Sequence, residues 1–225
     1  GNRKGLYGIE VLNEPISWIV YITAPSTGKA VDKEEAKGSG YVPLPFLREF
    51  YTNAYNRLRA ILPEEKTIVF HDGFRCTSWN RFFRESGFKN VALDTHPYIF
   101  AMENFVPVHK PWVYQIYINY QKKLIARIQQ HLPVIVGEWC ICNRYAEKQP
   151  KSAVSAEDAA SVRRERYREI AAMQLDAWNT ADGHIYWNYQ LLRSRTEAPD
   201  LRWKESWDFA RCIKNGWIGK EMFGN

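Results

Sequence analysis

The sequence PVIVGEW, residues 133–139, joins a short apolar run to a glycine and an acidic residue. Its apolar residues at 133–136 are continuous rather than alternating, which is typical of a strand buried on both faces of a parallel sheet. Similar runs occur at residues 6–12, 67–70, 90–95 and 183–187. We therefore predict five strands, each followed by polar or aromatic residues.

Helical patterns separate these strands, at residues 45–62, 78–85, 112–132, 156–180 and 205–215. Strands that alternate with helices indicate an α/β fold. Two longer segments, 16–42 and 142–155, are predicted to be loops that follow strands, as lids and subsite walls often do. Polar residues gather at the strand ends, and in a (β/α)8 TIM barrel that end carries the active site.

The number of strand-helix units is five, whereas a closed barrel needs eight in about 250 residues. Five units would leave two open sheet edges, which are a liability in water. We therefore expect residues 1–225 to form the C-terminal portion of a single TIM-barrel catalytic domain, about strands 4 to 8. Strands 1 to 3 are expected upstream or in another chain, and the chain opens on Gly1 rather than Met.

The composition excludes several function classes. The formal charge is +6, but the densest basic run, 163–168, is interrupted by Glu165 and fits a solvated helix face rather than a nucleic-acid site. No run approaches the roughly 18 apolar residues of a membrane helix. The four cysteines lack metal-type spacing, so we expect no metal site formed by them, and a disulfide involving Cys212 stays open. No cofactor and no other metal site is expected. The localisation also stays open.

Two acidic residues follow predicted strands, Glu14 and Glu138, 124 positions apart (138 − 14). Retaining glycosidases need two carboxyl groups about 5–5.5 Å apart, and residues at two strand ends of a barrel can meet that distance. Each has another reading when taken alone. Glu14 could be a helix N-terminal carboxylate before Pro15, and Glu138 could be a buried ion-pair partner.

The surrounding motifs narrow the choice. The segment 8–15, which ends in Asn-Glu-Pro, resembles the signature of glycoside hydrolase family 5, and Val-Gly-Glu-Trp at 136–139 resembles the nucleophile strand of that family. Phe-His-Asp-Gly-Phe at 70–74 and Leu-Asp-Thr-His-Pro-Tyr at 93–98 resemble the exo-β-1,3-glucanases of the family. The C-terminal segments 174–177, 186–189, 207–209 and 215–217 follow the same pattern in order.

The resemblance implies a role for each matched residue. Glu14 would be the acid/base and Glu138 the nucleophile, with Tyr98 donating its hydroxyl to the Glu138 carboxylate. Asn13 would hydrogen-bond the sugar 2-hydroxyl, and His96 would bind sugar or steady the acid/base. Further candidate substrate contacts are Trp187 as a stacking platform, His71, Asp72 and Phe100.

Simpler readings remain for some of these residues. His71 could be a core histidine, and Asp72 could support a loop. Phe100 and Phe105 could clamp a second sugar or pack in the core. Trp18 and Trp112 are candidate subsite walls.

The function that the resemblance implies is a retaining β-glycoside hydrolase that cleaves β-glucosidic bonds, of exo-β-1,3-glucanase or β-glucosidase type. Its partner would be a β-glucan oligosaccharide or β-glucoside. Alternatives are an endo-acting cellulase or mannanase of the same family, and a carbohydrate-binding relative without catalysis. Two features depart from the family pattern near the expected sugar-binding face. Gln190 stands where the family tends to have Lys, and the segment 191–203 is longer and adds Arg193, Arg195 and Arg202.

Overall fold

The computed structural model describes residues 4–23, 31–38, 40–149, 154–191 and 202–223. The chain divides into two compact units. Unit 1 comprises Gly1–Thr95 and Leu124–Ile135, and unit 2 comprises His96–Lys123 and Val136–Asn225. Arg193 and Arg195 lie outside the described residues.

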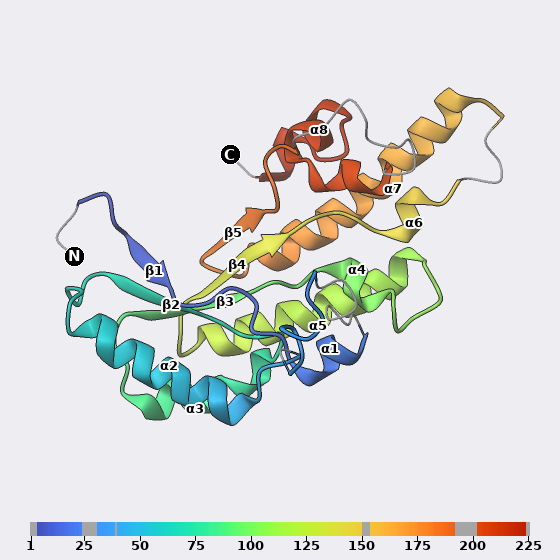
Figure 1. Cartoon of the computed structure of the whole chain (residues 1–225). Coiled ribbons are helices and arrows are strands. Elements are labelled where there is room, and N and C mark those ends of the chain that lie inside the picture. Colours follow the sequence, from blue (N-terminus) through green and yellow to red (C-terminus); the bar gives the residue numbers. More distant parts are fainter. Residues whose placement is uncertain (1–3, 24–30, 39, 150–153, 192–201, 224–225) are drawn as a thin grey trace. The chain divides into compact units, whose positions relative to one another are not determined.

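Unit 1 is built on parallel strands, β1 (Gly8–Glu10), β2 (Thr67–His71) and β3 (Val91–Thr95). Ile9 pairs with Ile68, and Phe70 pairs with Leu93. The Leu93 N–H donates to the Pro133 carbonyl, which brings the beginning of β4 (Val134–Trp139) next to β3. The connecting helices are α1 (Trp18–Thr23), α2 (Leu44–Arg59), η2 (Cys76–Ser78) and α3 (Asn80–Ser86), with α2 and α3 drawn below the strands (Figure 1).

The core of unit 1 is aromatic. The Tyr51 ring on α2 lies 4.7 Å from the Phe70 ring on β2 and 5.2 Å from the Trp79 ring, and all three are fully buried. All five residues of β3 are buried, as a strand covered on both faces should be. Burial of this aromatic cluster fixes α2 against β2, and thereby fixes the segments that follow the strands.

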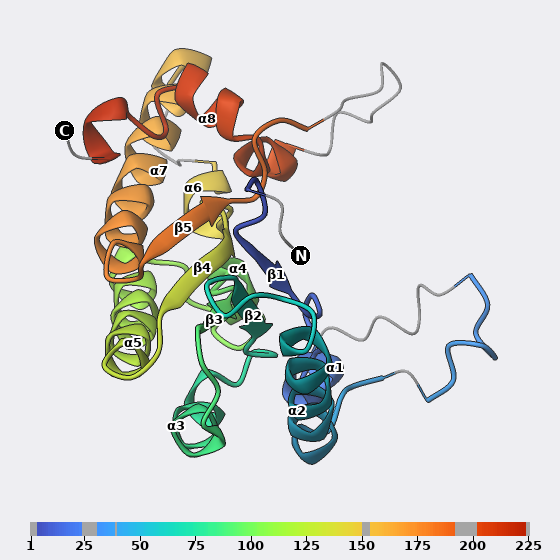
Figure 2. The same cartoon turned by 90° about the vertical axis from the view of Figure 1, so that its left-hand side faces the viewer.

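Unit 2 contains the rest of β4 and β5 (Gly183–Tyr186), joined where the Trp187 N–H donates to the Trp139 carbonyl. Its longest helix, α7 (Ala156–Trp178), runs beside these strands in both views (Figures 1 and 2). Ser155 caps α7, because its side chain accepts from the Asp158 N–H. The other elements are α4 (Ile99–Met102), the first part of α5 (Pro111–Gln129), α6 (Arg144–Glu147), η3 (Arg202–Trp207), α8 (Phe209–Lys214) and η4 (Lys220–Phe223).

The parallel α/β architecture agrees with the sequence prediction, and the differences are local. The terminal strands β1 and β5 are not buried on both faces, because they end the strand order β1-β2-β3-β4-β5. The predicted strand 133–136 continues to Trp139, so that Glu138 lies inside β4. The predicted helix 205–215 is interrupted at Asp208, whose side chain caps α8 by accepting from the Arg211 N–H.

The predicted loops contain short helices. α1 lies within 16–42 and α6 lies within 142–155. Among the helices that the structure describes, none is long and apolar enough to cross a membrane.

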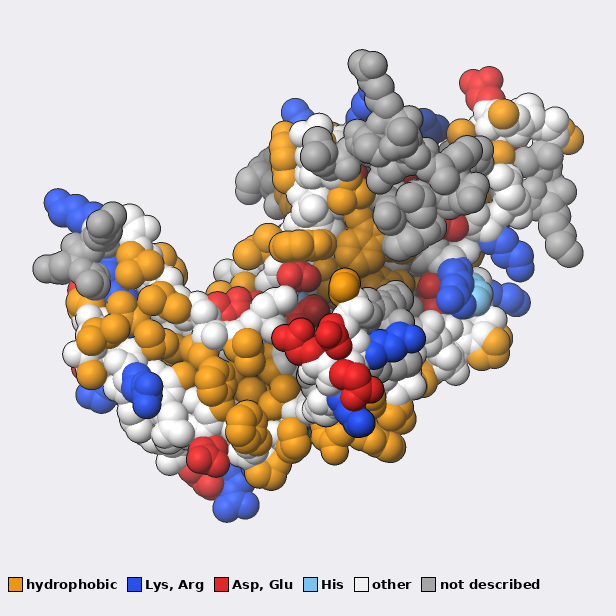
Figure 3. Space-filling model, viewed as in Figure 1, with side chains coloured by type: hydrophobic (Ala, Val, Ile, Leu, Met, Phe, Trp, Pro, Cys, Tyr) orange, Lys and Arg blue, Asp and Glu red, His pale blue; other side chains and the backbone are white. Residues whose placement is uncertain are grey.

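Hydrophobic side chains reach the surface of unit 1 over α2 (Figure 3). Phe46 and Phe50 on α2 are 62% and 36% exposed, and Ile61, just beyond α2, is 71% exposed. Tyr7, the residue before the edge strand β1, is 86% exposed. Contiguous exposed apolar groups of this kind often mark a surface that packs against another element.

Candidate active site

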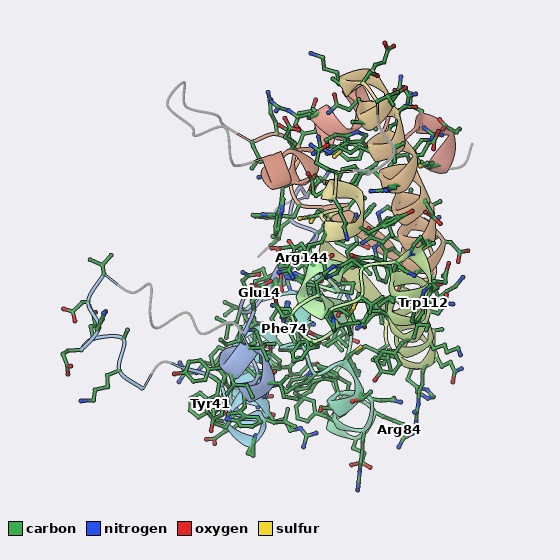
Figure 4. The ribbon with its side chains drawn as sticks, turned by 90° about the vertical axis from the view of Figure 1, so that its right-hand side faces the viewer. Glu14, Tyr41, Phe74, Arg84, Trp112 and Arg144 are labelled. Carbon is green, nitrogen blue, oxygen red and sulfur yellow. The ribbon has the colours of Figure 1, made fainter. Side chains whose placement is uncertain are left out.

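Glu14 lies in unit 1, just beyond the carboxyl end of β1, and its backbone has φ +43°. Residues other than glycine rarely adopt this left-handed conformation, and when they do they are often at functional sites. A Glu14 carboxylate oxygen and a His71 ring nitrogen lie within 4.8 Å of each other. Figure 4 shows Glu14 and Phe74 close together. The segment after β1 and the segment after β2 therefore meet at the acid.

His71 and Asp72, at the end of β2, are both buried and both support backbone. The His71 Nδ1 accepts from the Gly73 N–H at 2.8 Å, so the proton of the neutral ring is on Nε2. Asp72 accepts from the Phe74 N–H at 2.7 Å with one carboxylate oxygen and from the Thr95 hydroxyl at 2.9 Å with the other. These bonds favour loop support for Asp72, although substrate binding stays a prediction for both residues.

Glu138 lies in unit 2, near the carboxyl end of β4, with its side chain 15% exposed. The hydrogen bond expected from Tyr98 is present, since the Tyr98 hydroxyl donates to Glu138 Oε2 at 2.7 Å. The His96 Nδ1 lies 3.5 Å from the same oxygen. A hydroxyl donor that points at a carboxylate favours its ionised form, so Tyr98 both orients Glu138 and stabilises its charge.

A cluster of side chains in unit 2 holds the Tyr98 ring. Trp207 stacks on it with ring centroids 5.3 Å apart and planes at 29°, and Phe100 packs at 5.2 Å. Cys140 and Cys142, which follow β4, complete the cluster. Because the ring is only 7% exposed and packed on several sides, the Tyr98 hydroxyl has little freedom to leave Glu138.

The cysteines of this cluster are not reactive groups. All four cysteines of the chain are free and buried. Burial raises the pKa of the Cys142 thiol to about 11 and raises the pKa of the Cys140 thiol well above its usual value. Both thiols are therefore protonated at neutral pH and add no negative charge beside Glu138. The disulfide left open for Cys212 is not formed.

The remaining predicted aromatic residues differ in accessibility. Trp187, directly after β5, is 46% exposed, as a stacking platform should be, and its peptide bond to Asn188 is cis. Trp18, Phe105 and Trp112 are each more than half exposed. Phe100 is partly buried in the Tyr98 cluster, which fits the packing alternative. Asn13 is exposed beside Glu14.

The structure thus brings together Glu138, His96, Tyr98 and Phe100 in unit 2, and Glu14 with His71 in unit 1. Two features of unit 2 were not predicted from the sequence. Trp207, which belongs to the C-terminal motif at 207–209, stacks on Tyr98. Glu103 is 5% exposed, and it accepts from the Tyr114 hydroxyl and from the Arg144 N–H. This buried carboxylate ties the segment that carries Tyr98 to the segment after β4.

Comparison with known proteins gives distant similarity to one kind of enzyme. No family model matches the chain. It is 26% identical to the "Probable glucan 1,3-beta-glucosidase A" of Aspergillus terreus, over 76% of this chain and 43% of that protein. It is 24% identical to the "Glucan 1,3-beta-glucosidase" of Kluyveromyces lactis (93% of this chain, 47% of that protein) and to the "Glucan 1,3-beta-glucosidase 2" of Candida albicans (95% and 46%). The chain therefore spans less than half the length of these relatives, and the similarity supports a glycoside hydrolase.

Proposed function

We propose that this chain carries the catalytic residues of a retaining β-glycoside hydrolase that cleaves β-glucosidic bonds, of exo-β-1,3-glucanase or β-glucosidase type. The observation that carries the proposal is the 2.7 Å hydrogen bond from Tyr98 to Glu138 Oε2, near the carboxyl end of β4. A carboxylate held and aimed in this way suits a nucleophile. The names of the three relatives supply the substrate class.

The reaction would proceed by two displacements. In the first, Glu138 attacks the anomeric carbon, the bond to the leaving oxygen breaks, and Glu14 gives its proton to that oxygen. In the second, Glu14 takes a proton from water, whose oxygen attacks the anomeric carbon and releases Glu138. The product keeps the β configuration because two inversions cancel. This chemistry needs the two carboxyl groups about 5–5.5 Å apart.

The exposure of the neighbouring side chains and their positions beside Glu14 and Glu138 suggest the substrate contacts. The half-exposed ring of Trp187 would stack under the cleaved sugar, and Asn13 would hydrogen-bond its 2-hydroxyl. His96 would contact the sugar beside Glu138, since its Nδ1 lies 3.5 Å from Oε2. His71, Asp72 and Phe100 would shape the site around these groups.

We also propose that residues 1–225 are the C-terminal part of a single TIM-barrel domain, from about strand 4 to strand 8. Three strand-helix units would then cover β1 and the exposed apolar residues over α2. The relatives, which are more than twice as long as the matched part, are consistent with this organisation. A polypeptide that includes upstream sequence should melt more cooperatively than residues 1–225 alone, and an equal melt of the short chain would contradict the proposal.

Glu138→Ala tests the catalytic assignment. Loss of the nucleophile should lower kcat by at least about 10⁴-fold, as with other nucleophile deletions. The assay uses the full chain, meaning the polypeptide that includes the upstream sequence. Glu165→Ala, which removes an exposed carboxylate on α7, is the matched control and should retain full activity. Normal turnover by Glu138→Ala would refute the assignment.

Analysis of the products and of binding distinguishes an exo-acting enzyme from an endo-acting enzyme and from a carbohydrate-binding protein. Release of glucose as the first product from a β-1,3-glucan indicates exo action, whereas mixed oligosaccharides indicate an endo-acting cellulase or mannanase. Binding of the glucan by calorimetry with no hydrolysis of a chromogenic glucoside would indicate a carbohydrate-binding protein instead.

A further inference from the structure

Arg75 connects three segments that meet beside Glu14 in unit 1. Its guanidinium donates to the Pro15 carbonyl at 3.1 Å and to the Val42 carbonyl at 2.8 Å. The Val42 N–H in turn donates to the Ile16 carbonyl at 3.0 Å, which closes the base of the long segment after β1. One half-buried side chain thus ties together the two ends of that segment from the turn after β2.

The turn that presents Arg75 is itself fixed. The Arg75 N–H donates to the Asp72 carbonyl at 3.1 Å, and the Arg75 carbonyl accepts from the Ser78 N–H at 2.8 Å. Gly73 has φ +61°, and a Cβ at this position would lie 2.7 Å from the Pro15 carbonyl oxygen. Only glycine allows the two segments to approach this closely without strain. The donor and its acceptor are therefore both held in place.

The anchored carbonyl lies one residue beyond Glu14. Between the Glu14 Cα and the Pro15 carbonyl, the peptide bond is rigid and the proline ring fixes its own φ, so few torsions stay soft. Glu14 also has a strained φ of +43°, a conformation that persists only when its surroundings impose it. The bond from Arg75 to Pro15 supplies such a constraint on the direction of the Glu14 side chain.

We propose that Arg75 is a positioning residue that aims Glu14 as the acid/base, acting through the Pro15 carbonyl rather than by touching substrate. The inference rests on the proposed function of Glu14. Without Arg75, Glu14 would keep its carboxyl group but sample directions from which proton transfer to the leaving oxygen is slower. A misplacement of about 1 Å can cost about 10²-fold in rate.

Leaving-group dependence tests this role. Arg75→Met keeps the approximate length of the side chain and removes both donors, and Arg75→Lys keeps the charge but loses the fork that reaches two carbonyls. Both are assayed in the full chain on two aryl β-glucosides, one with a 2,4-dinitrophenolate leaving group, which departs without protonation, and one with phenol, which needs an acid. Glu14→Ala is the reference, and Arg84→Met is the control, since Arg84 is exposed on α3, away from Glu14 (Figure 4).

The expected result is a loss of kcat/KM of about 10²-fold for Arg75→Met on the phenyl glucoside and of less than about threefold on the dinitrophenyl glucoside. Arg75→Lys should show a smaller loss with the same selectivity, which carries the test if Arg75→Met unfolds at the assay temperature. Arg84→Met should match the unmodified chain. Equal losses on both substrates, or no loss, in the folded Arg75 variants would overturn the inference.

The Glu14→Ala variant distinguishes failure of the Arg75 role from failure of the acid/base role of Glu14. If Glu14→Ala is selective for the phenyl glucoside and the Arg75 variants are not, Glu14 stands as the acid/base and the role of Arg75 fails. If Glu14→Ala loses activity equally on both substrates, the acid/base assignment itself fails, and the inference about Arg75 fails with it.

Discussion

Replacing Tyr98 with Phe removes one hydroxyl from a ring that is held on several sides. The ring packs against Trp207, Phe100, Cys140 and Cys142. The phenyl group of the variant should therefore keep its position. The change therefore removes the donor of the 2.7 Å hydrogen bond to Glu138 Oε2.

The size of the effect follows from the type of bond. A hydrogen bond to a charged group contributes about 1.5–3 kcal/mol. The free chain already makes this bond, so its loss acts mainly on the ionisation of Glu138, at 1.36 kcal/mol for each pH unit, and kcat/KM at neutral pH should fall by about 10-fold or less. The donor favours the ionised carboxylate, so without it protonation of Glu138 occurs at higher pH. In the profile of kcat/KM against pH, the acidic limb should therefore move to higher pH by about one to two units.

Tyr114→Phe is the matched control, because the Tyr114 hydroxyl is also buried and also donates to a carboxylate, that of Glu103. Both variants should lose stability by a similar amount, measured by urea denaturation, whereas only Tyr98→Phe should move the acidic limb. An unchanged limb in folded Tyr98→Phe, or the same shift in Tyr114→Phe, would refute the reasoning.

Three further results are expected. Gly73→Ala should lower the free energy of unfolding, measured by urea denaturation, by about 1–3 kcal/mol more than Gly87→Ala does. Both glycines have positive φ, but only a Cβ at Gly73 would meet the Pro15 carbonyl. Equal losses in the two variants would contradict this. Trp187→Ala should raise KM for a β-glucan oligosaccharide by about 3- to 10-fold through lost stacking, with Trp187→Phe in between, and an unchanged KM would exclude Trp187 as a platform. The Cys142 thiol, with a pKa of about 11, is only about one part in 1,000 thiolate at pH 8. Ellman's reagent should therefore react far more slowly with the native chain, whose cysteines are buried, than with the denatured chain. Equal rates would argue against burial of the thiols.

The strands could be predicted because buried parallel strands leave a local mark, a continuous apolar run bounded by polar residues. All five runs found in the sequence correspond to strands. Their ends were less accurate, since the extension of β4 to Trp139 depends on pairing with β5, which is not a local property. The interruption at Asp208 was missed because Asp also occurs inside helices, and only its bond to the Arg211 N–H shows that it acts as a cap.

The hydrogen bond from Tyr98 to Glu138 was expected only through the resemblance to a family, and it is present. The stacking of Trp207 on Tyr98 and the buried Glu103 could not be read from the sequence, because they join residues far apart in the chain that share no periodic pattern. Arg75 left even less of a signal. Its acceptors are backbone carbonyls, which every residue carries, so no residue type marks the contact.

The most direct measurement is to trap the covalent intermediate. A β-glucoside with fluorine in place of the 2-hydroxyl and a good leaving group should let the first displacement occur and slow the second, because the fluorine destabilises both oxocarbenium-like transition states. Digestion and mass spectrometry of the inactivated full chain should then find one fluoroglucosyl group on Glu138, and none in Glu138→Ala. Turnover of ordinary substrate with no trapped adduct, or an adduct on a different carboxylate, would contradict the assignment of Glu138 as the nucleophile.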